Sequence, residues 1–210
     1  QAIIDDEQMV LEIGELKFKF MTAAEALIHG DLHTGSVMVK SKEDGTEIST
    51  RAFDSEFSFY GPIAFDIGAV LANFYIAMAR SIALGRTEHV EFIQTLPTAL
   101  WNSFEIHFRK LWPTRIDKRV FSDQLLEVLL EVWKEDAFGF AAAKMVRRIV
   151  GLAKTTDIET LDPNIRVGAA RGVLRSAQLL IRERHKHSSI DEVTTKVMEI
   201  MDEVRTGDGR

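Results

Sequence analysis

The sequence predicts a mainly α-helical domain that carries one small β-hairpin near its start. Three patterns indicate this fold class: apolar residues recur at helical spacing in the first 25 positions, two short strand-like segments then flank a turn, and everything after Gly61-Pro62 has helical periodicity. The chain has 210 residues, 46% hydrophobic and 28% charged. That length and composition are sufficient to bury a core.

The first 62 residues predict a helix, a loop and a hairpin, in that order. A helix over 5–25 presents its apolar residues at helical spacing, namely Met9, Val10, Ile13, Leu16, Phe20 and Met21. A glycine-containing loop over 28–36 follows. Strands are expected over 36–39 and 48–53, with a turn at Lys42-Glu-Asp-Gly-Thr46 between them.

The rest of the chain predicts helices only. The segment 64–84 is strongly apolar and is expected at the centre. Further helices are expected over 89–111, 122–134, 138–154, 163–184 and 190–204, and residues 206–210 form a polar tail. The aromatic residues of the third helix are spaced as core residues, although a stacking platform is the alternative: Trp101, Phe104, Phe108 and Trp112.

Composition limits the partners and the compartment. The formal net charge of −6 argues against nucleic acid or an anionic membrane as the main partner. The longest apolar run, 67–79, is about 13 residues and is shorter than a bilayer span requires. The chain has no cysteine, which excludes disulfides and fits a reducing cytosol, so a cytoplasmic location is expected.

Three carboxylates in two loop-like segments suggest phosphoryl transfer. Asp31 follows a His29-Gly30 pair, and Asp54 and Glu56 follow the second strand. One carboxylate can accept a hydroxyl proton, and two others on one side of an extended segment can hold a hard cation such as Mg²⁺. The alternative for each acid alone is a turn residue or a helix cap. His29 is better explained as a buried hydrogen-bonding residue than as a base.

In combination, these motifs closely resemble the 5-methylthioribose kinase family. The resemblance rests on His29-Gly-Asp-Leu-His-Thr-Gly-Ser36, Asp54-Ser-Glu-Phe-Ser-Phe-Tyr-Gly-Pro62 and Phe65-Asp-Ile-Gly68, and it continues through Met145-Val-Arg-Arg-Ile-Val-Gly-Leu-Ala153. It covers about 16–181. It implies the helical C-terminal lobe of the protein-kinase-like, aminoglycoside-phosphotransferase-like fold.

The resemblance implies a role for each matching residue. Asp31 would be the catalytic base that faces the anomeric hydroxyl of methylthioribose, and Asp54 and Glu56 would bind Mg²⁺. Arg147 and Arg148 match a twin-arginine motif associated with sugar binding and charge stabilisation. Because neighbours on a helix point about 100° apart, the residues themselves leave open that only one arginine meets the ligand.

Three further residues match supporting positions of the family's catalytic loop. Asp66 matches an acid that braces the loop from the following helix, and His29 belongs to the loop itself. Ser36 stands where most kinases of this fold have a metal-binding Asn, and a serine there is expected in this family. Metal binding should therefore depend mainly on the two carboxylates of the second segment.

As a whole, the resemblance implies ATP- and Mg²⁺-dependent phosphorylation of 5-methylthioribose to its 1-phosphate, in methionine salvage, by a cytoplasmic homodimer. Residues 1–205 would form the C-terminal lobe, with the catalytic loop at 28–36, the metal-binding segment at 53–62 and a helical subdomain at 64–204. No glycine-rich loop precedes Asp31, and Lys17 and Lys19 lie in a predicted helix rather than a strand. The N-terminal nucleotide-binding lobe is therefore expected to be missing, and these residues alone are expected to have little or no activity.

Two alternatives stay open. One is a related small-molecule kinase that acts on an aminoglycoside, choline or homoserine, although such kinases normally carry Asn at position 36 and a plain Asp in the metal segment. The other is a truncated, non-catalytic lobe that binds a partner or dimerises.

Overall fold

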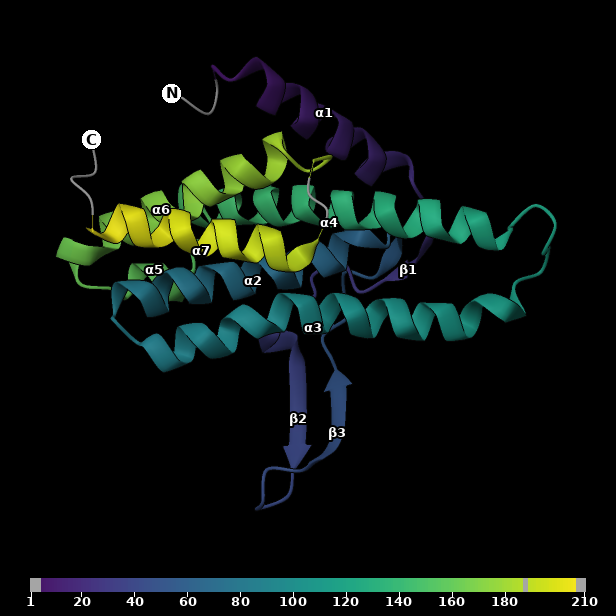
Figure 1. The fold of residues 1–210 in the computed structure, drawn as a ribbon, viewed down its shortest axis with the longest axis horizontal. Coiled ribbons are helices and arrows are strands. Elements are labelled where there is room, and N and C mark those ends of the chain that lie inside the picture. Colours follow the sequence, from purple (N-terminus) through teal and green to yellow (C-terminus); the bar gives the residue numbers. More distant parts are fainter. Residues whose placement is uncertain (1–4, 187–188, 207–210) are drawn as a thin grey trace.

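The computed structural model describes residues 5–186 and 189–206, and the described part is mainly helical (Figure 1). The predicted fold class is confirmed. The elements are α1 (Glu7–Thr22), β1 (Ala26–Ile28), η1 (Thr34–Ser36), β2 (Val37–Ser41), β3 (Glu47–Ala52), β4 (Phe59–Gly61), α2 (Ala64–Ala83), α3 (Thr87–Leu111), η2 (Trp112–Thr114), α4 (Asp123–Val150), α5 (Thr156–Glu159), α6 (Pro163–Arg182) and α7 (Ile190–Thr206). The tail expected at 206–210 lies, apart from Thr206, outside the described residues.

Helix α2 is the centre of the core, as its apolar sequence predicts. It packs against α3, α4, α6 and α7, and α1 crosses the body on the far side from α3 (Figure 1). By length and composition α2 could also cross a membrane, but 67% of that window is buried against the other helices. Its apolar side chains are therefore accounted for by packing within the domain.

Helix α4 corrects the sequence prediction. Two helices were expected, over 122–134 and 138–154, whereas the structure has one continuous helix, Asp123–Val150. The sequence suggested a break near Glu135-Asp136, but the Asp136 carboxylate is paired with Lys19 and Arg184. Because these partners compensate the buried charge, the helix continues through it.

The β-structure has one element that sequence reasoning missed. β2 and β3 form the predicted antiparallel hairpin around the 42–46 turn. The three-residue strands β1 and β4 form a second antiparallel pair, with Leu27 opposite Tyr60. This pair joins the start of the loop that carries Asp31 to the end of the segment that carries Asp54.

The aromatic residues of α3 belong to the core, as expected. Trp101 is buried, and Phe104 and Phe108 pack edge-to-face on Trp133 of α4, with ring centroids 6.2 and 4.9 Å apart. Such contacts favour packing of α3 against α4. The alternative of an exposed stacking platform does not fit this arrangement.

Candidate active site

Backbone contacts bring together the two motif segments, the catalytic loop at 28–36 and the metal-binding segment at 53–62. The Phe53 amide donates to the Ser36 carbonyl at 3.0 Å, and the β1–β4 pair joins their other ends. The His29 ring adds a contact between Nε2 and the Phe53 carbonyl at 2.8 Å. Since a carbonyl only accepts, Nε2 is the protonated nitrogen. The His29 ring is thus partly buried and bonded to the backbone of the second segment, and its role in supporting the catalytic loop stays a prediction.

Gly30 lies against the backbone of the second segment. Its φ is +84°, in the left-handed region that favours glycine. A Cβ added there would lie 2.1 Å from the carbonyl oxygen of Phe57. Both the backbone conformation and the available space therefore require glycine immediately before Asp31.

Asp66 holds the loop around Asp31 from the first turn of α2. Its buried carboxylate accepts the amides of His29 at 2.6 Å, Gly30 at 3.2 Å and Leu32 at 3.3 Å. Three donors on one carboxylate satisfy backbone groups that would otherwise be unpaired in a tight loop. The loop on both sides of Asp31 is therefore fixed relative to the central helix.

Asp31 forms an ion pair that sequence reasoning missed. Lys144 of α4 places Nζ 2.6 Å from Asp31 Oδ1, and the lysine side chain is only 6% exposed. Burial alone would raise the pKa of Asp31, but the Lys144 ammonium, with His33 and Arg148, holds that pKa below its usual value. The available signal was a single lysine in the apolar part of α4, four residues before Arg148.

The two arginines have different surroundings. Arg148 is half-buried, acts electrostatically on Asp31 and directs Nη1 toward the Ala153 carbonyl at 3.4 Å, whereas Arg147 is exposed. Lys144 and Arg148 are four residues apart and share one face of the helix. The two arginines therefore have different surroundings, and contact of either one with a ligand stays a prediction.

Asp54 and Glu56 lie on the surface of the second segment. The extended geometry expected for them is wrong: Asp54 has φ +66°, and Glu56 lies in a turn closed by the Ser58 amide and the Ser55 carbonyl at 3.0 Å. Among the described residues neither carboxylate has a hydrogen bond or ion pair. Both carboxylates are exposed and offer oxygen ligands, which Mg²⁺ prefers.

Ser36 and His33 organise the end of the loop. Ser36 is buried, and its hydroxyl donates to the backbone carbonyl of Asp31 at 3.4 Å. The His33 ring accepts the Gly35 amide on Nδ1 at 3.0 Å and thereby caps η1. Both side chains stabilise the turn that follows Asp31.

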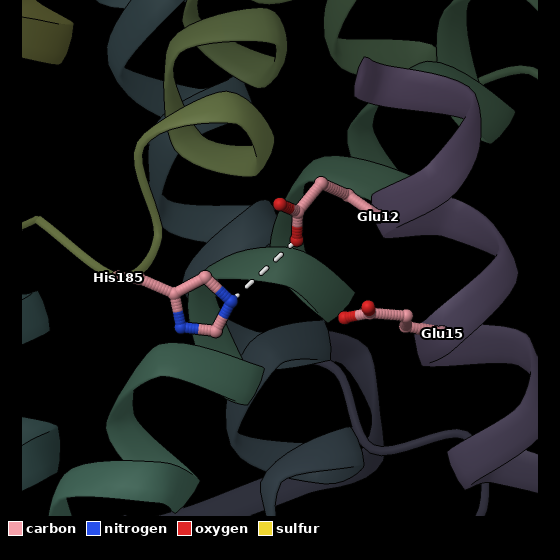
Figure 2. Close-up of side chains that lie close together, drawn as sticks. All are labelled: Glu12, Glu15 and His185. Carbon is pink, nitrogen blue, oxygen red and sulfur yellow. Dashed lines mark ion pairs between the residues drawn. The ribbon is translucent and has the colours of Figure 1, made fainter. Parts of the chain in front are cut away.

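A second cluster of potential ligands joins α1 to the segment that follows α6. Figure 2 shows Glu12 and Glu15 of α1 opposite His185, and their ligand atoms lie within 4.8 Å of one another. The buried Arg184 already pairs with Glu12 at 2.6 Å and Glu15 at 2.8 Å, and also with Asp136 at 3.0 Å. The guanidinium therefore compensates these acids, and the cluster fixes α1 to α4 and the end of α6.

Comparison with known proteins finds that the chain is similar to methylthioribose kinases. No protein-family model matches the chain. It is 36% identical to methylthioribose kinase 1 of Oryza sativa subsp. japonica over 93% of this chain and 48% of the relative. It is 37% identical to a methylthioribose kinase of Geobacillus sp. (strain WCH70) over 92% of this chain and 46% of the relative. The chain thus spans about half the length of the curated relatives it matches, and the resemblance predicted from the motifs is confirmed.

Proposed function

The chain is homologous to methylthioribose kinases over most of its length, and we propose that it supplies the catalytic, metal-binding and sugar-binding lobe of such an enzyme. The reaction is ATP-dependent phosphorylation of the anomeric hydroxyl of 5-methylthioribose, which gives the 1-phosphate for methionine salvage. The observation that carries the proposal is the geometry around Asp31. Asp66 holds the backbone of its loop, and Lys144 pairs with its carboxylate.

Asp31 is the proposed base. Its side chain is 34% exposed, so one side of the carboxylate remains open to an acceptor hydroxyl. As the hydroxyl oxygen bonds to the γ-phosphorus, the bond from that phosphorus to the ADP oxygen breaks and the hydroxyl proton passes to Asp31. Positioning of the two reactants, rather than base strength, contributes most of the rate enhancement.

Cationic side chains next to Asp31 suit an anionic reaction centre. Arg148 lies on the same helix face as Lys144, and exposed Arg147 is available to the sugar or to phosphate oxygens. Preorganised positive charge of this kind stabilises charge that is spread over the transferring phosphoryl group.

Asp54 and Glu56 would hold Mg²⁺. Both carboxylates are exposed, and the neighbouring Ser36 hydroxyl is already directed at a backbone carbonyl. When bound, the ion supplies charge neutralisation at the phosphate oxygens. The proposed metal site therefore consists of the two carboxylates without a side-chain ligand from the catalytic loop.

Turnover with an Asp31→Asn variant tests the assignment. The assay uses these residues joined to a nucleotide-binding lobe, with ATP, Mg²⁺ and 5-methylthioribose. Loss of a positioned base should lower kcat by about 10²- to 10⁴-fold. Asp44→Asn, in the exposed hairpin turn, is the matched control and should retain wild-type turnover. A kcat for Asp31→Asn within a few-fold of wild type would contradict the proposal.

The same assay with other acceptors tests the related kinases. Faster phosphorylation of choline, homoserine or an aminoglycoside than of methylthioribose would move the substrate assignment to one of them. Binding of a protein partner without any turnover would favour a non-catalytic lobe.

The cytoplasmic location and the homodimer are further parts of the proposal, and both come from the family resemblance. Sedimentation equilibrium measures the oligomeric state directly, and a monomer across micromolar concentrations would contradict the dimer.

A further inference from the structure

Lys144 is the buried cation closest to the proposed base. Its side chain is 6% exposed, in a stretch of α4 where Ala141, Ala142 and Met145 are also buried. A buried ammonium is costly unless it is paired, and the partner here is Asp31 Oδ1 at 2.6 Å. The lysine is therefore a buried side chain whose ammonium is held by one carboxylate oxygen.

The other charged groups around Asp31 are less directly engaged. Arg148 on α4 and His33 on the same loop act on the carboxylate electrostatically. Asp66 of α2 binds the amide of Leu32 next to it. Among the described residues Asp31 Oδ2 accepts no hydrogen bond, so Lys144 occupies one carboxylate oxygen and leaves the other free.

We propose that Lys144 is a positioning residue for Asp31, which it acts on by holding Oδ1 so that Oδ2 is presented to the acceptor hydroxyl. This inference rests on the proposed kinase function. A carboxylate with one oxygen fixed has a single productive orientation, which reduces the number of misaligned encounters with the hydroxyl. Lys144 does not need to touch the substrate for this role.

The same pair affects the pH dependence of the base. Lys144 lowers the pKa of Asp31, so the carboxylate stays ionised, and competent as a base, to lower pH than an unpaired aspartate. Removing the ammonium should raise the pKa of Asp31. The acid limb of the rate profile should then move to higher pH, a change that loss of packing alone would not produce.

A carboxyl ¹³C NMR titration of the 210-residue chain tests the pairing without any need for turnover. The pKa of Asp31 should rise in Lys144→Met and in Lys144→Gln, which is a second neutral variant that keeps a polar group in the site. It should stay low in Lys144→Arg, which retains the charge. Lys134→Met is the matched control, because Lys134 is a buried lysine on the same helix that pairs with Glu131 at 2.8 Å. An unchanged pKa in both neutral variants would overturn the proposal.

Kinetics of the same variants, joined to a nucleotide-binding lobe, test the positioning role. Lys144→Met should lower kcat by about 100-fold with little change in the KM for ATP, and Lys144→Arg should recover part of the loss. Full turnover by Lys144→Met at neutral pH would refute the inference. If wild type fails to phosphorylate methylthioribose while the titration shows the expected shift, the proposed function fails and the Lys144–Asp31 pairing still holds.

Discussion

Replacing Gly30 by alanine should separate the two motif segments. The structure provides a matched control, because Gly30 and Gly45 have the same φ of +84°. A Cβ at Gly45 would meet nothing within 4 Å, whereas one at Gly30 would lie 2.1 Å from the Phe57 carbonyl oxygen. The two variants therefore share the backbone cost and differ in the steric clash.

The magnitude follows from these two terms. An L-residue in the left-handed region costs about 1–2 kcal/mol, and this cost applies to both variants. At Gly30 the backbone of the two segments must also move apart by about 1 Å, and overpacking of this kind costs about 1–3 kcal/mol more. Gly30→Ala should thus lose about 2–5 kcal/mol of unfolding free energy, and Gly45→Ala about 1–2 kcal/mol.

Urea denaturation followed by tryptophan fluorescence measures both values. In the active protein, the same displacement should lower kcat by about 100-fold for Gly30→Ala and leave Gly45→Ala close to wild type. Equal losses of stability in the two variants would show that the Phe57 carbonyl does not restrict the residue at position 30. Equal turnover would show that the contact does not position Asp31.

Other perturbations give equally definite results. Arg184→Met should lose about 3–5 kcal/mol of stability in denaturation, because it removes the buried cation shared by Glu12 and Asp136, whereas Arg182→Met, at a 47% exposed site, should lose less than about 1 kcal/mol. Asp66→Asn should lower kcat and protection of the catalytic-loop amides in hydrogen exchange together; unchanged exchange would refute its bracing role. Asp54→Asn should require more Mg²⁺ for half-maximal rate, with a larger effect in the double variant with Glu56→Gln, and an unchanged Mg²⁺ titration would remove both residues from the metal site.

The parts of the fold predicted correctly are those that local sequence determines. The periodicity of α2 and the turn residues of the β2–β3 hairpin need no distant partner to be recognised. The break predicted in α4 was wrong because Asp136 is compensated by Arg184, 48 positions away. The β1–β4 pair was missed because three-residue strands carry almost no periodic signal.

In the candidate site, too, features set by local sequence were predicted and those that depend on distant residues were missed. The motifs predicted Asp31, Asp54 and Glu56 as site residues, and all three lie in the two segments that the fold joins. The partner of Asp31 was missed, because Lys144 is 113 positions away, and a lone lysine in an apolar helix does not indicate which acid it pairs with. The backbone conformation of Asp54 could not be predicted from the sequence either, since a positive φ at a non-glycine residue depends on the surrounding backbone.

The β2–β3 hairpin has an evolutionary consequence. It projects away from the helices in Figure 1, and the hydrogen bond between Phe53 and Ser36 closes it at its base. The hairpin at 37–52 therefore begins and ends next to the Ser36–Phe53 hydrogen bond, and its tip around Gly45 is exposed. Insertions or deletions at this tip should leave the catalytic loop and the metal segment in register, so the hairpin is a natural place for length variation or for a peptide tag.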